Sequence, residues 1–196
     1  DSNKPYVGRN YTDGGSRPYV YSNGGIRDNN GTMHYGNDAF DQDGDSYWLS
    51  VGNSPGWSSA YEFVEGKFTT QKLRAVKIRV AGGPYDVYVS IRNWSGSGSK
   101  WRGTKTIPYK SRTLNTGARI PYVKKVRVGA NQTVVVNVPD GNANRIRLTL
   151  KATWNSGIGA YRHRAGVREV WVSDKYGTKT TSSTNSAGVI LSVHEA

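Results

Sequence analysis

The sequence predicts an all-β protein, folded as an antiparallel β-sandwich. Glycine contributes 24 of the 196 residues, well above its usual share of about 7 %, so turns are frequent. The 13 tyrosines, 6 tryptophans and many valines are of the types that strands favour. They are numerous enough to build a core, although only 35 % of the chain is hydrophobic. No stretch has a convincing helical period.

Nine segments alternate between apolar and polar residues with the period of two that is typical of a half-buried strand. Turn residues separate them, for example at Gly82–Pro84 and Asp140–Asn142. The predicted strands are Tyr47–Val51, Ala60–Glu65, Ala75–Val80, Tyr85–Arg92, Val123–Val128, Thr133–Val138, Arg145–Lys151, Val167–Ser173 and Val189–Val193.

The length of the chain is that of one domain with two extensions. We expect residues 1–36, rich in Gly, Asn and Tyr, to form an N-terminal arm. Residues 37–173 are expected to form the sandwich, and the polar residues 174–196 a C-terminal tail. Because the chain starts at Asp1 and not at Met, we expect it to be a fragment of a longer protein.

The composition excludes several classes of function. Cysteine is absent, which excludes disulfides, thiolate catalysis and cysteine-bound metals. No apolar run reaches the length of about 20 residues that a membrane span needs. We find no catalytic set, because Glu62 and Glu65 would point to opposite faces of a strand and the histidines lack metal-ligand spacing. We therefore expect a protein that is not an enzyme.

Charge is distributed unevenly along the chain. The net charge is +13, but residues 1–70 carry −4 whereas residues 71–175 carry +17. Strand alternation directs basic side chains of the second region away from the core, for example Lys77, Arg145 and Arg147. Two interpretations stay open. These faces are solvated exteriors that keep the protein in solution, or they bind nucleic acid or another anionic polymer.

Four aspartates crowd into one short segment, at Asp38, Asp41, Asp43 and Asp45. They form either an acidic surface turn or the ligands of a hard cation such as Ca²⁺, which selects oxygen ligands on a glycine-containing loop. The segment is not an EF-hand, because Gly44 comes too early and no glutamate follows at the twelfth position of the loop.

The segment Ala39–Trp48, AFDQDGDSYW, resembles the A-x-D-G-D-x-x-T-x-W signature of the galactose-binding-like β-sandwich superfamily. This superfamily includes discoidin domains, the C-terminal domains of coagulation factors V and VIII, and many carbohydrate-binding modules. Later segments resemble strands of the family in the same order, among them Asn144–Leu148 and Ala165–Val172. The resemblance covers residues 39–173 and implies a jelly-roll topology.

In this family one structural Ca²⁺ is often held by the signature aspartate and threonine, nearby carbonyls and a late glutamate. The resemblance therefore implies a calcium site here, although Gln42 replaces the signature glycine and a serine replaces the threonine. The candidate ligands are Asp41, Ser46 and Glu169, with Asp38 and Asp43 as possible helpers.

Two Gly-rich loops, at residues 92–102 and 154–164, carry aromatic rings beside hydrogen-bond donors. An aromatic platform with such donors suits the apolar face and the hydroxyls of a sugar. The alternative is that the rings pack on the rim of the sandwich, as we expect Trp48 and Trp171 to pack in the core. The candidate ligand-binding residues are Trp94, Trp101, Trp154, Tyr161, Arg162, His163 and Arg164.

The segment TWNSGIGAYRHRAGVREVWVS, residues 153–173, resembles minor tail proteins and receptor-binding tail modules of phages that infect actinobacteria. This resemblance implies a non-catalytic viral protein that binds a glycan on the host cell. It would act outside cells or on the virion, as a homo-oligomer within a fibre or tail. The alternative function is binding of nucleic acid or another anionic polymer.

Overall fold

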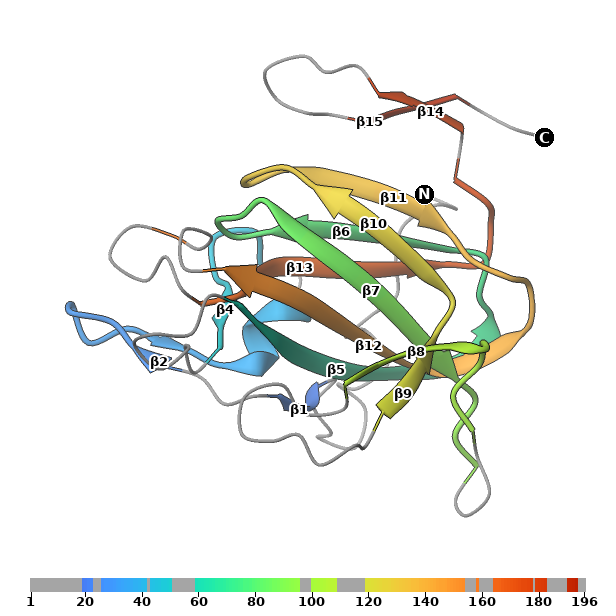
Figure 1. The fold of residues 1–196 in the computed structure, drawn as a ribbon, viewed down its shortest axis with the longest axis horizontal. Coiled ribbons are helices and arrows are strands. Elements are labelled where there is room, and N and C mark those ends of the chain that lie inside the picture. Colours follow the sequence, from blue (N-terminus) through green and yellow to red (C-terminus); the bar gives the residue numbers. More distant parts are fainter. Residues whose placement is uncertain are drawn as a thin grey trace.

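A computed structural model gives the fold of the chain. It describes residues 19–22, 26–41, 43–50, 59–95, 100–108, 119–153, 158, 164–177, 179–182 and 190–193. Two antiparallel sheets stack on each other (Figure 1), which confirms the predicted sandwich. In this part of the chain the helical structure is one short 3-10 turn, η3 (Gly36–Ala39). No helix of the described ranges is long and apolar enough to cross a membrane.

Each sheet is built from strands that are distant in sequence. The five-stranded sheet has the order β1 (Tyr19–Ser22), β5 (Ser59–Lys72), β12 (Asn142–Thr153), β7 (Tyr85–Arg92) and β10 (Lys124–Val128). The four-stranded sheet has the order β11 (Thr133–Asn137), β6 (Ala75–Val80), β13 (Gly166–Ser173) and β4 (Trp48–Leu49). Three further pairs are β2 (Ile26–Arg27) with β3 (Met33–His34), β8 (Lys105–Pro108) with β9 (Arg119–Tyr122), and β14 (Lys179–Ser182) with β15 (Ile190–Val193).

All nine predicted strands have a counterpart. The strands that the alternation missed are β1, β2, β3, β8, β9 and β14, each of two to four residues, which is too short to show a period. The predicted boundary at residue 37 is not a boundary of the sheets, because β1 lies within the predicted arm and pairs with β5. The predicted tail starts on the four-stranded sheet, where the Gly177 N–H donates to Asn137 Oδ1 at 2.7 Å.

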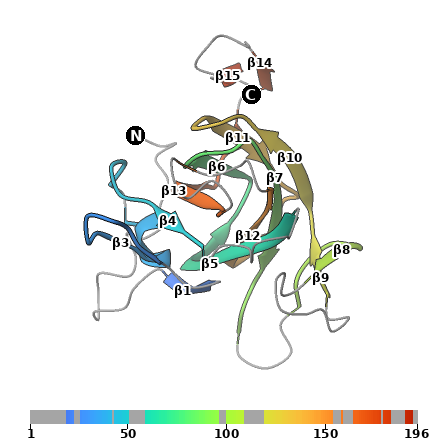
Figure 2. The same cartoon turned by 60° about the vertical axis from the view of Figure 1, so that its left-hand side comes forward.

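The main core lies between the two sheets. Figure 2 shows these sheets from a second side. Leu148 of β12 stands opposite Val64 of β5 and Val89 of β7, and all three are fully buried. Ile78 of β6 belongs to the same core, and so does Trp48, as predicted. Removing this much apolar surface from water is the main favourable term in folding.

Trp171 is not in the core, contrary to prediction. The pairing of β13 with β6 shifts between Val167 and Glu169, and such a bulge reverses which side chains face inward. After the shift Trp171 stands opposite Lys77, half-buried, with the ammonium of Lys77 4.8 Å from its ring centre.

A third layer, not predicted, covers the outer face of the five-stranded sheet. Here β9 lies against β7 and pairs with β8, and this hairpin lies outside the two main sheets in both views (Figures 1 and 2). The hydroxyl of Ser90 donates to the carbonyl of Pro121 at 2.7 Å. Ile107, Ile120 and Tyr88 form a separate buried cluster beneath this hairpin. Side chains that point away from the main core are therefore not all in solvent.

Gly66 tests the contact between η3 and the sheet. A Cβ at Gly66 would lie 2.6 Å from the ring of Phe40, which is fully buried just after η3. We expect Gly66→Ala to lower the free energy of unfolding by about 1–3 kcal/mol through overpacking, measured by urea denaturation.

The matched control is Gly44→Ala. A Cβ at Gly44 would meet only the end of the Arg79 side chain, at 3.7 Å, so the expected change is within about 0.5 kcal/mol. Equal effects of the two substitutions would contradict the proposed packing of η3 on β5.

Candidate functional site

Among the described residues that were predicted to bind ligand, Arg164 lies apart from Trp94 and Trp101. Trp94 and Trp101 follow the end of β7, whereas the carbonyl of Arg164 accepts a hydrogen bond from Tyr85, at the start of β7, at 3.3 Å. The seven residue steps of β7 put these two ends about 23 Å apart. The guanidinium of Arg164 is used within the protein, because its Nη1 donates to the Ser50 carbonyl at 2.9 Å. Trp154, Tyr161, Arg162 and His163 lie outside the described residues.

The end of β7 that carries Trp94 is built on one buried carboxylate, that of Glu65. Glu65 of β5 stands opposite Arg147 of β12, and its Oε1 lies 3.0 Å from both Nε and Nη2 of Arg147. Its Oε2 lies 3.6 Å from Nη2 of Arg92 and 3.9 Å from Nη1 of Arg145. Three guanidiniums thus share one carboxylate on the outer face of the sheet. Glu62 faces the opposite way, opposite Leu150 of the main core.

Arg147 corrects the simple expectation from alternation. It points away from the main core as predicted, but only 1 % of its side chain is exposed. The ring of Phe63 lies 3.9 Å from its guanidinium carbon, and the ring of Trp101 lies 5.7 Å from it. These rings and the carboxylate of Glu65 surround the side chain, so Arg147 is part of a buried network and not of the solvated surface.

The two predicted tryptophans lie over the guanidiniums of Arg92, Arg145 and Arg147, which we call the guanidinium layer. The guanidinium carbon of Arg92 is 4.3 Å from the ring centre of Trp101 and 4.7 Å from that of Trp94. The guanidinium carbon of Arg145 is 5.1 Å from the ring of Trp94. Such cation–π contacts stabilise the indoles in place. Trp101 packs against the cluster under the β8–β9 hairpin, whereas 39 % of Trp94 is exposed.

Asn144, which we did not predict as a site residue, fixes the backbone of Trp94. The Trp94 N–H donates to Asn144 Oδ1 at 2.6 Å, and Asn144 Nδ2 donates to the Trp94 carbonyl at 2.7 Å. The same amide nitrogen lies 3.2 Å from Oγ1 of Thr70 on β5. An indole held at both backbone groups and backed by two cations is a preformed aromatic platform. Chemically, it can stack on a ring that offers an apolar face.

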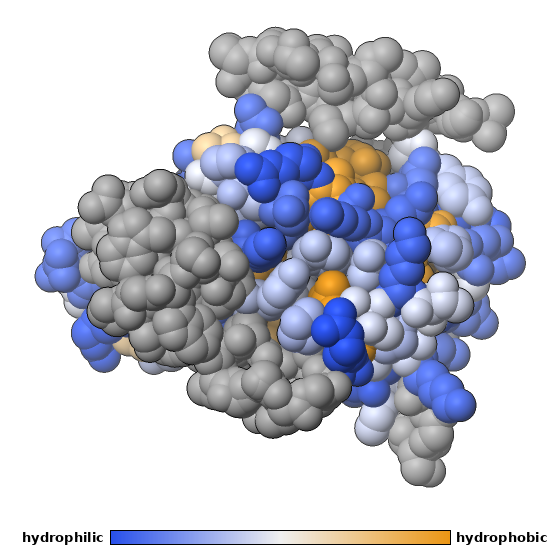
Figure 3. Space-filling model, viewed as in Figure 1, coloured by the Kyte–Doolittle hydropathy of each residue, from blue (hydrophilic) through white to orange (hydrophobic). Residues whose placement is uncertain are grey.

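On the face of the molecule seen in Figure 3, hydrophilic residues cover most of the described surface, and apolar residues emerge in a few places. This is the side of the five-stranded sheet and of the β8–β9 hairpin, as in Figure 1. Beside the Trp94 ring, the guanidiniums of Arg92 and Arg145 offer hydrogen-bond donors to a ligand.

The predicted calcium ligands come together only in part. Ser46 Oγ donates to Asp41 Oδ2 at 2.5 Å, whereas Asp43 Oδ1 accepts from the Asp45 N–H. Burial raises the pKa of Asp38, the Tyr35 N–H opposes this, and the negative charge of Asp41 adds to it.

Glu169 is fully buried on β13, opposite Arg79. Across the described ranges no three acidic or histidine side chains come close enough together to hold a metal ion. A calcium site here would therefore depend on backbone carbonyls beside Asp41 and Ser46, and it stays a prediction.

Comparison with known proteins places the fold. No family model matches the chain, and no curated protein matches it. Among solved structures, a variant of chitosan-binding module 1 from a chitosanase/glucanase of Paenibacillus sp. IK-5 is similar over 86 % of this chain and 98 % of its own, with a TM-score of 0.53 and 12 % identity. CBM32-3 from a family 31 glycoside hydrolase of Clostridium perfringens is similar over 81 % of this chain and 90 % of its own, with a TM-score of 0.51 and 12 % identity.

The chain therefore shares the β-sandwich fold of these two modules. The β-sandwich fold that the resemblance of Ala39–Trp48 implied is thus confirmed. Residues 39–48 run from the last residue of η3 to the first residue of β4. The platform lies elsewhere, at the ends of β5, β7 and β12.

Glu65→Gln tests whether the carboxylate holds the guanidinium layer. Glutamine keeps the shape but removes the charge shared by three arginines. Because uncompensated buried charge is costly, we expect the free energy of unfolding to fall by about 3–5 kcal/mol, measured by chemical denaturation with Trp fluorescence.

Asp86→Asn is the matched control. Asp86 also pairs with an arginine, Arg127, at 3.2 Å, but that guanidinium side chain is 63 % exposed. An exposed pair contributes about 0–1 kcal/mol. If the two substitutions cost the same, the network at Glu65 does not hold this face together.

Proposed function

We propose that this chain is a non-catalytic carbohydrate-binding module that recognises a glycan on a cell surface. The observation that carries this proposal is the platform at Trp94, a partly exposed indole whose backbone Asn144 holds at two points. The proteins of similar fold support it, since one is named as a chitosan-binding module and the other as a CBM32 module.

The chemistry of the platform suits a sugar ring. A pyranose offers C–H groups on its faces and hydroxyls around its edge, so it stacks on an indole and accepts hydrogen bonds from neighbouring donors. Arg92 and Arg145 each retain 17 % exposure of the side chain, and their guanidiniums lie against the Trp94 ring. One such platform has little area and binds weakly. Repetition of the module in a homo-oligomer would raise the overall affinity.

We place this module in the tail of a phage that infects actinobacteria, where it would serve as the receptor-binding part. The support is the resemblance of residues 153–173 to tail modules of such phages. The +17 charge of residues 71–175 suits an anionic cell envelope. The protein would then act outside the cell, on the virion. Binding of fluorescently labelled protein to whole actinobacterial cells tests this role, and equal binding to unrelated cells would contradict it.

Trp94→Ala tests the platform directly. The substitution removes the stacking surface, which contributes a large share of binding in a small aromatic site. We expect the affinity for the best glycan on an array to fall about tenfold or more, while the Tm stays close to that of the wild type because the ring is partly in solvent.

The matched control is Tyr176→Ala. Tyr176 is 46 % exposed and also carries a guanidinium over its ring, that of Arg74 at 5.6 Å. It follows β13 and lies outside the platform, so glycan binding should not change. Undiminished binding by the Trp94 variant, or an equal loss in both variants, would remove the platform as the glycan site.

Calcium removal gives a further test, on the loop of Asp41 and Ser46. If a cation relieves the repulsion between Asp38 and Asp41, EDTA will lower the Tm and added Ca²⁺ will restore it, because the ion binds only the folded state. The Asp41→Ala variant should not respond to either. A wild-type Tm that EDTA leaves unchanged would exclude a structural calcium.

A further inference from the structure

We infer that the glycan carries acidic groups, and that a lysine groove beside the platform binds its carboxylates or phosphates. The inference rests on the proposed function, because it names the charge class of the same ligand. The lysine groove has a volume of about 460 Å³ and is lined by residues 103–105, 122–125 and Pro139. It lies between β8, β9 and β10 on the side of the five-stranded sheet.

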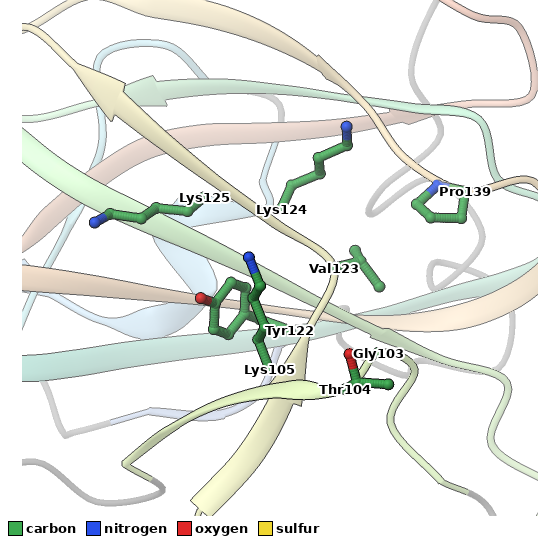
Figure 4. Close-up of a pocket in the computed structure, with 8 residues that line it drawn as sticks. All are labelled: Gly103, Thr104, Lys105, Tyr122, Val123, Lys124, Lys125 and Pro139. Carbon is green, nitrogen blue, oxygen red and sulfur yellow. The ribbon is translucent and has the colours of Figure 1, made fainter.

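Three lysines contribute to the lining of the lysine groove. Figure 4 shows the side chains of Lys124 and Lys125 leaving β10 in different directions, with Lys105 of β8 beside the ring of Tyr122. All three lysines are exposed. Because their charges are spread along the groove and not focused on one point, they suit an extended anion with repeated charges more than a single small ion.

No carboxylate within the described ranges lies at ion-pair distance from these three lysines. The acidic residues of the neighbouring elements are occupied by other cations: Asp86 pairs with Arg127 at 3.2 Å, and Asp140, which follows Pro139, lies 3.4 Å from Arg74. The lysine groove therefore has an excess of positive charge, which attracts polyanions and which dissolved salt screens.

The wall of the lysine groove is preformed. Gly103 has a φ of +104°, and a Cβ there would lie 2.3 Å from the backbone oxygen of Tyr122. Only glycine allows the chain to approach β9 this closely. On the other side, the Val123 N–H donates to the Val89 carbonyl at 2.8 Å and ties the groove to the sheet. A preformed site loses little conformational entropy when a ligand binds.

The aromatic rings here favour an acidic sugar over a nucleic acid. Single-stranded nucleic acids bind by stacking successive bases on open aromatic faces. Tyr122 instead packs edge-to-face on Tyr88 at 4.9 Å, and Tyr88 is 7 % exposed, with the ammonium of Lys125 5.6 Å from its ring centre. These rings are used within the protein, so recognition in the lysine groove depends on charge and hydrogen bonds.

The lysine groove and the platform belong to one stretch of chain. Trp101 contacts the guanidinium layer, and two residues later Gly103 begins the wall of the groove. The Arg102 N–H between them donates to the Ile91 carbonyl of β7 at 2.9 Å, which fixes this stretch on the sheet. A polysaccharide that stacks on Trp94 could therefore reach the lysines with its acidic groups.

The test compares an acidic polysaccharide with its neutral methyl ester and with two phosphate polymers. The probes are polygalacturonate, its fully methyl-esterified form, poly(glycerol phosphate) and single-stranded DNA of similar length. The groove variant replaces Lys105, Lys124 and Lys125 with Gln. The control variant removes the same charge from the other side of the protein and from the tail, by replacing Lys77, Arg79 and Lys175 with Gln. All six residues are exposed, and circular dichroism checks that both variants fold.

We expect the groove variant to bind the acidic probes about tenfold more weakly than the wild type and to lose most of the salt dependence of binding. The control variant should bind them nearly as well as the wild type. The preferred acidic probe distinguishes a carboxylate from a phosphate source. Equal losses in the two variants, or groove-dependent binding of DNA that is tighter than that of either acidic polymer, would overturn the inference.

The two proposals fail in different ways. If Trp94→Ala leaves the binding of every glycan unchanged, the platform is not the carbohydrate site. If the wild type prefers neutral glycans and the groove variant binds as the wild type does, carbohydrate binding stands and the acidic class is wrong.

Discussion

The carboxylate of Glu65 is the interaction on which the outer face of the five-stranded sheet depends. The neighbouring strands bring three arginines to the same place. These cations are only partly solvated there, so they would repel one another strongly without an anion between them. Glu65 is fully buried and contacts all three. Taking charges out of water is costly, and it is tolerated only where geometry and hydrogen bonds compensate. Here one carboxylate on β5 compensates for basic residues on β7 and β12.

The rest of the site follows from that arrangement in layers. The guanidiniums are fixed over the sheet, the indoles of Trp94 and Trp101 lie on the guanidiniums, and the β8–β9 hairpin covers what remains of the face. Trp101 packs against the hairpin, whereas Trp94 lies partly in solvent, where Asn144 holds its backbone. A tryptophan on an isolated glycine-rich loop would lose conformational freedom on binding. This one has already lost it in folding, so stacking costs less.

Alternation predicted the two main sheets well, because one face of each long strand must be buried in a common core. It could not predict what covers the opposite faces. Arg147 was therefore expected in solvent, although 1 % of its side chain is exposed. Trp171 was misplaced because a one-residue shift in β13 cannot be read from the sequence. Asn144 gave no signal, since its partners are backbone groups 50 residues away.

The uneven charge of the chain has more than one physical role in the fold. Part of the +17 region is neutralised internally, as at Glu65, and part is solvated on the other sheet, as at Lys77 and Arg79. The lysine groove combines ammonium groups that have no carboxylate partner among the described residues with a preformed hollow. Each unit of an acidic polysaccharide has both an apolar ring face and a negative group. If the proposed ligand is such a polymer, its ring faces would stack on the platform and its negative groups would meet the lysines of the groove, which is close to the platform along the chain.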